Sequence, residues 1–481
     1  MDVNVEVMVK AEATEAKSFA GIIYDNTIGI NSSETMKTLY TILIFLLLAA
    51  GGLSTTAQEK WNLQQCIDYA LDNNIQIKQQ DLAVGYQQNQ LAQARSNRLP
   101  NLNGQLGNNY NFGRSLTYEN TYQNTNSMSL SGYLGTEVTV WNGFQLQNLV
   151  KQRDLDLKAT MQDYQKAKDD LILNIAALYL EILFAEELIG IDEAQMEVTR
   201  MQIARSEKLV ESGRLAKGAV FEIEAQLAKE EVQLVTDQNR AQLAYLNLYQ
   251  LLELPVPKYF KIEKPVLPEL QAGMFSFNSQ NVFQNALQSR PEIEASRLRV
   301  ESAMVQLEQA RGARWPRLSF GANFYDNFND NYKDMISQKT IAFGKQLNNN
   351  KRYGFGLTLN IPIFNQFQVR NGISNATLQV EDYKYRLLTS QNMLQKDIEQ
   401  AYTNATSALK RYISSEKAVH SSTEAFRYAE EKLNVGMVTP VEYNQIKNNL
   451  TIAQSQLTQA KFEYVFRSKI LDFYNGIPIK L

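Results

Sequence analysis

The stretch Tyr353-Gly-Phe-Gly-Leu-Thr-Leu-Asn-Ile-Pro-Ile363 alternates between large apolar residues and small or polar ones. Alternation over about ten residues, with one face apolar and the other polar, is typical of a strand in a transmembrane β-barrel. Three other stretches alternate in the same way: residues 102–112, 128–140 and 318–324. An ordinary half-buried sheet is the alternative, but nothing else in the chain is left to cover its apolar face. We therefore predict four membrane strands.

The four strands belong to two copies of one pattern. Leu91–Arg95, followed by Arg98-Leu99-Pro100, reappears as Leu307–Arg311, followed by Arg314-Trp315-Pro316, at a shift of 216 residues. After the strands, Trp141-Asn142 and Phe144-Gln145 reappear as Phe364-Asn365 and Phe367-Gln368, at a shift of 223. The seven extra residues must lie in the strand-joining loop of the second copy. The sequence therefore predicts an internal duplication.

A long helix follows the strands of each copy, from about Phe144 to Ser212 and from about Phe367 to Val435. The apolar residues recur at alternating intervals of four and three, which is the seam of a coiled coil rather than the broad face of a globular helix. The seam consists of Tyr164, Leu171, Ile175, Leu178, Ile182, Ala185 and Ile189, and of Leu387, Leu394, Ile398, Ala401, Ala405, Ala408 and Tyr412. At about 1.5 Å per residue such helices approach 100 Å, a length that suits a rod or a tube.

Each long helix ends at a glycine and turns back into a second helix. The turns are Ser212–Gly218 and Val435–Pro440, where Gly213 and Gly436 fit a left-handed C-cap and Pro440 fits the first turn of the returning helix. We expect the first repeat to span residues 58–253, a proline-bearing linker 254–278, and the second repeat 279–481. Each repeat holds a helix, two barrel strands and a long helical hairpin.

The N-terminal region carries an export signal in an unusual position. Met36-Lys37 is followed by the apolar run Leu39–Leu48 and by small residues up to Ala57. This layout predicts a secretory signal over residues 36–57, with an apolar run too short to span a bilayer. We expect residues 1–35 to be a mis-called extension, the alternative being a tail-extended signal.

Composition removes most catalytic and metal-binding possibilities. The chain has one His and one Cys, so no His/Cys metal cluster can form and any catalytic triad would need His420. We expect Cys66 to be a buried thiol, and we expect His420 and the acidic pairs Glu230-Glu231 and Glu430-Glu431 to lie on solvated helix surfaces. The net charge of −3 gives no case for nucleic acid. We therefore expect no enzyme activity, no cofactor and no metal.

Four strands cannot close a barrel, and an open sheet edge in lipid is prohibitively costly. Single-chain barrels begin at about eight strands. The chain must therefore share its barrel with other copies, and a cyclic trimer would supply twelve strands continued by twelve helices. Rings at the strand ends would form an aromatic girdle: Tyr110, Phe112, Trp141, Trp315 and Phe364.

From about Trp61 to Leu481 the sequence resembles the TolC-like outer-membrane efflux proteins. The resemblance rests on three features together. They are the duplicated plan, the motif Arg-Ser-Asn-Arg-Leu-Pro (residues 95–100) that leads into the first strand, and the turn Gly-Met-Val-Thr-Pro-Val-Glu (residues 436–442). It implies a mainly α protein with a small β part: a homotrimer whose transmembrane β-barrel takes four strands per chain and continues into a long periplasmic α-helical barrel. It also implies a place in the outer membrane, docking to a periplasmic adaptor, and indirect coupling to an inner-membrane pump in tripartite efflux or type I secretion.

The resemblance further implies functional residues at the periplasmic tip. In the second copy, Glu442 falls on the first position of the family's acidic pore-entrance ring, and Gln445 falls on the second. In the first copy the arrangement is reversed, with Ala219 at the first position and the acidic residue Glu222 at the second. Val438 replaces a common basic residue, which argues against a gate latched by ion pairs there. The turns expected to contact the adaptor comprise Gly213, Arg214, Lys217, Gly436, Met437, Val438, Thr439 and Pro440.

Two other functions would explain part of the sequence. A periplasmic coiled-coil adaptor or stalk protein would explain the helical hairpins and the signal, but not four paired amphipathic strands. An outer-membrane enzyme or uptake porin is disfavoured by the single His and by helices far longer than a porin needs. The sequence therefore favours a passive exit duct.

Overall fold

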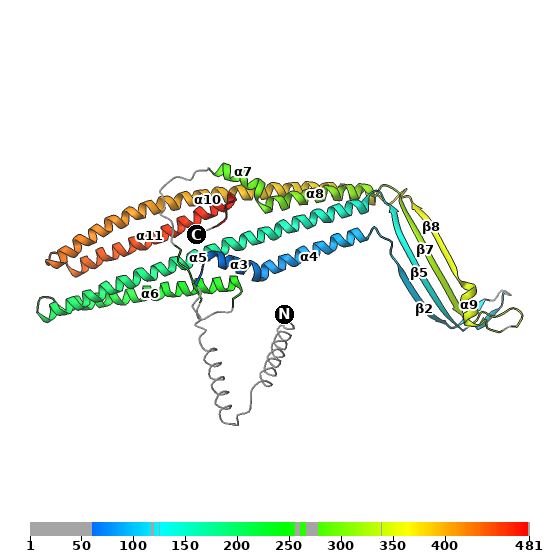
Figure 1. The fold of residues 1–481 in the computed structure, drawn as a ribbon, viewed down its shortest axis with the longest axis horizontal. Helices are drawn as coiled ribbons and strands as arrows, with labels where there is room; N and C mark the ends of the chain where they lie inside the picture. The colour runs from blue at the N-terminus through cyan, green and yellow to red at the C-terminus, as the bar shows by residue number, and fades with distance from the viewer. Residues whose placement is uncertain are drawn as a thin grey trace, which may run out of the picture. The chain divides into compact units, whose positions relative to one another are not determined.

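The computed structural model describes residues 60–116, 120–124, 126–254, 260–265, 278–337 and 339–479. The predicted extension (1–35), the predicted signal (36–57) and most of the predicted linker lie outside these ranges. Within the described part, helices dominate and a single four-stranded sheet lies at one end of them (Figure 1).

The sheet is antiparallel and has the order β2-β5-β7-β8, with β2 at Asn103–Asn111, β5 at Ser127–Trp141, β7 at Arg317–Asn329 and β8 at Arg352–Asn360. The two repeats pair their strands in the same register. Gly104 of β2 faces Leu134 of β5, and the shifts of 216 and 223 carry this pair onto Phe320 and Leu357, which also face each other. The duplication predicted from the sequence is therefore present in the backbone.

The connections between paired strands differ in the two repeats. In the first, β3 (Arg114–Leu116) pairs with β4 (Tyr122–Asn124). In the second, the segment is longer and holds a short helix, α9 (Phe343–Asn350), which packs on β7. Buried Gln346 ties α9 to the end of β7, because its side chain accepts from Asn329 N and donates to Asn329 O, both at 2.9 Å. The extra residues of the second repeat thus lie in its loop, as predicted.

Each repeat begins with two short helices and continues, after its strands, with a long hairpin. The first repeat has α3 (Leu63–Asn73), α4 (Ile75–Ser96), α5 (Gln145–Glu211) and α6 (Lys217–Leu252). The second has α7 (Ser279–Ser289), α8 (Pro291–Gly312), α10 (Gln368–Asn434) and α11 (Pro440–Tyr474). Asn74 separates α3 from α4, because its side-chain oxygen caps α4 at Gln76 N (2.9 Å).

Packing follows the same lateral order as the sheet. Helix α5 lies between α4 and α8, and α8 lies between α5 and α10, so α4 and α10 are the outer helices of this layer. Farther from the sheet, α5 pairs with α6 and α10 with α11, and both hairpin turns lie at the end opposite the strands (Figure 1). The helices α4-α5-α8-α10 therefore lie side by side in the same order as the strands β2-β5-β7-β8 that they adjoin.

The core lies where the predicted coiled-coil seams pack. In α10 the seam residues Leu394, Ile398, Ala401, Ala405 and Ala408 are all buried, as are Leu171, Ile175, Ile182 and Ala185 in α5. The first seam packs around buried Cys66. Part of the predicted linker is also ordered here: β6 (Lys261–Ile262) pairs in parallel with β1 (Lys60–Trp61), and Tyr179 Oη donates to Glu263 O at 2.6 Å.

Candidate functional site

The sheet has one apolar face that the single chain leaves uncovered. Leu106, Phe355, Leu357 and Leu359 are each more than half exposed there. A contiguous exposed apolar surface of this kind marks contact with a partner or with lipid. At the helix-proximal end of the strands, the rings of Trp141 and Trp315 meet edge to face, 6.3 Å between centroids, where the predicted aromatic girdle would place them.

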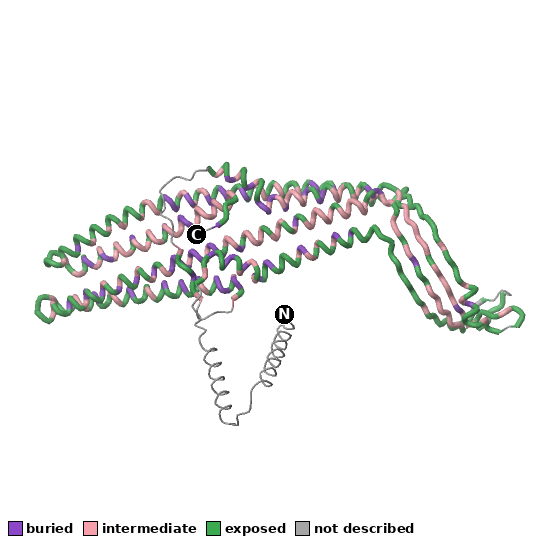
Figure 2. Tube along the Cα trace, viewed as in Figure 1, coloured by how far each residue is buried: buried purple, intermediate pink, exposed green. Residues whose placement is uncertain are grey.

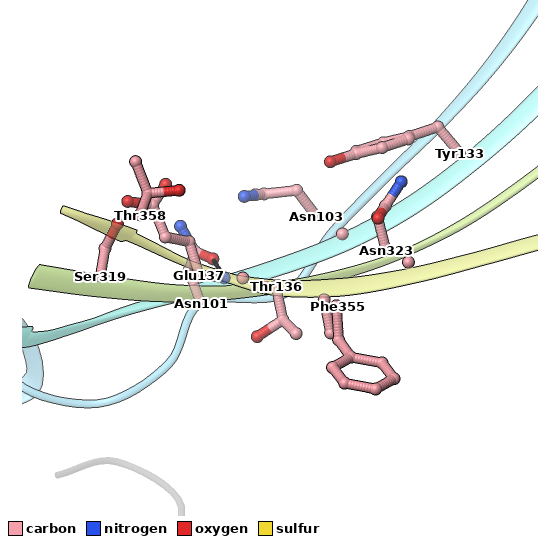
Figure 3. A pocket seen from close by; sticks show the side chains of 14 residues that line it. Asn101, Asn103, Tyr133, Thr136, Glu137, Ser319, Asn323, Phe355 and Thr358 are labelled. Carbon is pink, nitrogen blue, oxygen red and sulfur yellow. Dashed lines mark hydrogen bonds between the residues drawn. The ribbon is translucent and has the colours of Figure 1, made fainter.

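The other face of the sheet is polar and concave. Figure 3 shows Asn103, Tyr133 and Asn323 extending to one side of the strands and Phe355 to the other. Glycines make room on the polar side: a Cβ atom at Gly135 would come 2.3 Å from Tyr133 Oη. The alternation predicted from the sequence thus produces two chemically distinct faces.

The hairpin turns share one backbone geometry. Gly213 has φ +69° and Gly436 has φ +75°, which confirms the predicted left-handed caps. In each turn the next residue closes the helix, with Arg214 N donating to Leu209 O and Met437 N donating to Lys432 O, both at 2.8 Å. Beyond the caps, Lys217 is already the first residue of α6 and Thr439 is the N-cap of α11. The remaining predicted contact residues are Val438 and Pro440, both half-buried.

Glu442 also makes a structural contact at the start of α11. It is the third residue of α11 and forms a capping box with Thr439: Glu442 N donates to Thr439 Oγ1 and Thr439 N donates to Glu442 Oε2, both at 3.2 Å. The equivalent N-cap of α6 is Ala216, which has no side-chain cap. Glu442, Gln445 and Glu222 are all exposed in the single chain.

A buried polar network joins α5, α6 and α11 near the tip. Lys447 of α11 is only 3% exposed; its Nζ donates to Gln195 O at 2.9 Å and to Thr199 Oγ1. It lies 3.7 Å from Glu230 Oε1 of α6, which also accepts from Gln195 and Gln226, both at 3.1 Å. The network therefore ties the return helix of the second hairpin to both helices of the first.

The prediction that Glu230 lies on a solvated surface is wrong, although its neighbour Glu231 is exposed. The heptad pattern contained the missing signal. Buried residues recur every seven positions in α6 at Ile223, Glu230, Asp237 and Ala244, and in α5 at Ala185, Asp192, Thr199 and Ser206. Extending the α5 seam by one and two heptads from Ala185 identifies Asp192 and Thr199.

Two buried carboxyl groups, those of Asp192 and Asp237, lie next to each other one heptad closer to the sheet than this network. Asp192 of α5 and Asp237 of α6 are 7% and 5% exposed, and Asp192 Oδ2 has no hydrogen-bond partner in the structure. Burial, together with the neighbouring Asp237 carboxyl and the charge of Glu230, raises the pKa of Asp192 to about 7. An ionised Asp192 side chain is therefore costly at neutral pH beside this second carboxyl group.

Cys66 and His420 lie where the sequence predicted them. Cys66 is fully buried, which raises the pKa of its thiol to about 12, and His420 is exposed on α10. Over the described ranges, no three His, Cys, Asp or Glu side chains are grouped as ligands of a metal ion would be. None of the described helices is both long and apolar enough to cross a bilayer.

Comparison with known proteins covers most of the chain. The sequence profile of the outer membrane efflux protein family matches residues 66–253 and 282–472. Outer membrane protein TolC of Salmonella enteritidis is 25% identical over 467 residues, spanning 92% of this chain and 86% of that protein. The solved structure of CusC matches with TM-score 0.74 and 17% identity over 86% of this chain and 92% of its own. VceC of Vibrio cholerae matches with TM-score 0.73 and 17% identity over 87% of this chain and 97% of its own.

These matches confirm the predicted mainly helical, duplicated fold with its small β part. They also confirm a place in the outer membrane, with a periplasmic helical portion, and a role as an exit channel of efflux or secretion systems. Because the family profile spans both repeats, the chain belongs to the outer membrane efflux protein family.

Proposed function

We propose that three copies of the chain close one duct that conducts solutes passively from the periplasm to the outside, without chemistry of its own. The observation that supports this is the sheet: strands β2 and β8 each have one neighbour, and its apolar face is uncovered. Unpaired strand edges in lipid leave backbone groups unsatisfied, so the sheet must close on other copies. Three copies supply twelve strands, well above the minimum of about eight.

The oligomeric state tests this proposal. The detergent-extracted protein should be a trimer by light scattering, and its mobility on denaturing gels should change on heating. A monodisperse monomer would contradict the shared barrel and would favour a stalk or adaptor role for the helical hairpins.

We place the periplasmic partners at the hairpin turns. Gly213 and Gly436 set the same backbone turn in both repeats, and Arg214, Lys217 and Met437 are exposed around them. A periplasmic adaptor protein docking there would couple the duct to an inner-membrane pump. Six equivalent turns per trimer would give the adaptor a repeated surface.

We also propose that Glu442 and Glu222 form an acidic entrance to the duct, with Gln445 one turn farther along α11. Like charges confined in a narrow mouth attract cations. The capping box allows a clean test, because glutamine serves at the same position of a capping box and removes only the charge. Glu442→Gln with Glu222→Gln should therefore weaken cation selectivity and block by multivalent cations, measured by single-channel conductance in planar bilayers with asymmetric salt.

Thr439→Ala is the matched control, because it breaks the cap but keeps the Glu442 carboxylate. It should alter stability at the tip and leave the reversal potential near that of the wild type. If the double glutamine variant shows an unchanged reversal potential and unchanged block, these residues do not line the entrance.

A further inference from the structure

The loop between β7 and β8 presents two neighbouring apolar side chains to solvent. Ile336, at 95%, is the most exposed large apolar side chain in the described part of the chain, and Met335 beside it is 92% exposed. Figure 2 shows that most of the segment beyond the end of β7 is exposed as well. Single exposed apolar residues are normal on a protein surface. The order and the surroundings of this pair are what distinguish it.

Hydrogen bonds hold the loop in a narrow hairpin. Asp334 N donates to Lys339 O at 2.9 Å, and Ile341 N donates to Tyr332 O at 2.8 Å. At the tip, Ile336 N donates to Asp334 Oδ1 at 3.1 Å, and the next backbone N–H donates to the same oxygen at 2.8 Å. The backbone that carries the apolar pair is therefore ordered in advance, so binding through these side chains costs little further ordering.

The base of the hairpin continues the apolar face of the sheet. Phe328, near the end of β7, faces Leu130 of β5 and belongs to the apolar row of its strand. The ring of Phe343 on α9 covers it, 5.1 Å between centroids, so that Phe328 is 9% exposed and Phe343 remains 48% exposed. The apolar surface thus passes from the strands onto α9, directly after the hairpin.

A carboxylate marks the level of the membrane at which this surface lies. Asp326 stands on the apolar row of β7, between Phe324 and Phe328. A charged side chain on a lipid-facing row belongs at or beyond the edge of the hydrocarbon. Phe328 and Phe343 therefore fall at the level of the lipid headgroups, where aromatic side chains are favoured.

The segment around the apolar pair is basic. Residues 331–351 contain one acidic residue, Asp334, whose carboxylate accepts the hydrogen bonds of the tip. They also contain four lysines, all exposed: Lys333, Lys339, Lys345 and Lys351. The corresponding segment of the first repeat, residues 112–126, has one Arg and one Glu. Apolar side chains surrounded by lysines suit the surface of an anionic bilayer.

We propose that Met335, Ile336 and Phe343 form an interfacial anchor that enters the outer leaflet, while Lys333, Lys339 and Lys345 contact the phosphate groups of its lipids. This inference rests on the barrel proposed above and adds a membrane contact outside the strands, one in each copy. The position of Phe343 on the apolar side of β7 argues for the lipid. To cover the mouth of the duct instead, the hairpin would have to cross to the polar face.

Site-specific fluorescence in lipid nanodiscs tests the anchor in the full-length trimer. Ile336→Cys is labelled with bimane, which reports the polarity around it, and the native Cys66 is fully buried and should stay unlabelled. In nanodiscs of phosphatidylcholine with phosphatidylglycerol, spin-labelled lipid should quench the bimane and aqueous iodide should not. Leu357→Cys, on the apolar face of β8, is the control for the sheet. Asn124→Cys, exposed on β4, is the matched loop control and should be quenched by iodide.

The lysines are tested in the same labelled protein. Each lysine beside an anionic surface should raise the ratio of inserted to water-exposed tips about fivefold. The triple variant Lys333→Gln, Lys339→Gln, Lys345→Gln should therefore lose most of the lipid quenching in anionic nanodiscs and change nothing in nanodiscs of phosphatidylcholine alone. Lys384→Gln, which removes an exposed lysine of α10, is the control for total charge and should behave like the parent protein.

The outcomes separate the anchor from the barrel. Iodide quenching at Ile336 together with lipid quenching at Leu357 would overturn the anchor and leave the barrel intact. Absence of lipid quenching at Leu357 would refute the membrane-embedded sheet on which the anchor rests. Lipid quenching at Ile336 that is equal in the triple lysine variant would overturn the contact with anionic headgroups.

Discussion

Replacing Lys447 by methionine should destabilise the helical tip far more than its position on a return helix suggests. The substitution keeps the length of the side chain and removes the ammonium group. Glu230, which is 8% exposed, would then lack its counter-ion within the network. Leaving one partner of a buried ion pair uncompensated costs about 3–5 kcal/mol. The Gln195 carbonyl also loses a donor at 2.9 Å, which adds to the loss.

A double-mutant cycle separates this charge effect from lost packing. Lys447→Met with Glu230→Gln removes both charges, so its loss of stability should be smaller than that of Lys447→Met alone by about 2 kcal/mol. Guanidinium denaturation followed by far-UV circular dichroism measures the free energy of unfolding, with all variants at one protomer concentration. Lys384→Met, which breaks an exposed pair with Glu381, is the matched control and should cost less than about 1 kcal/mol. Additive losses, or a Lys447→Met loss no larger than the control, would refute the reasoning.

Three other tests address separate parts of the structure. The pKa of Asp192 is raised to about 7 in the folded state, so the native state holds a proton that the unfolded chain loses from about pH 4 upward. The free energy of unfolding should therefore fall as the pH rises from about 4 to 7. Asp192→Asn should abolish that fall, measured by thermal unfolding over a pH series. Leu357→Lys on the apolar face should cost about 2–4 kcal/mol near the bilayer midplane, whereas Thr358→Lys on the polar face should be tolerated; equal damage in a folding assay in lipid vesicles would mean that the faces are misassigned. The double variant Gly436→Val with Gly213→Val forces a β-branched residue to φ near +70° at both turns. Export should be lost, while trimers should still form on native gels. Normal export by this variant would argue against adaptor docking at the turns.

Much of the architecture was predictable because it repeats. The shifts of 216 and 223, found from short motifs such as Trp141-Asn142, also relate the strand registers of the two repeats. The caps at Gly213 and Gly436 followed from single glycines between two helical patterns. The burial of Glu230 was not predicted, because an acidic pair on a helix is typical of a solvated face and the predicted seams did not include this return helix. No residue pattern showed that Lys447 of α11 would meet Glu230, since that contact depends on how two hairpins distant in sequence pack.

The equal lengths of α5 and α10, 67 residues each, limit how this protein can change during evolution. One residue inserted into α5 alone would advance its turn by about 1.5 Å and rotate every later seam position by about 100°. Only whole heptads preserve the phase of the seam, each adding about 10 Å. Such an insertion must occur in both repeats, or one hairpin would outgrow the other. The depth that the duct reaches into the periplasm can therefore change only in coarse, paired steps, whereas the loop bearing α9 is longer than its counterpart in the first repeat and so is free of this constraint.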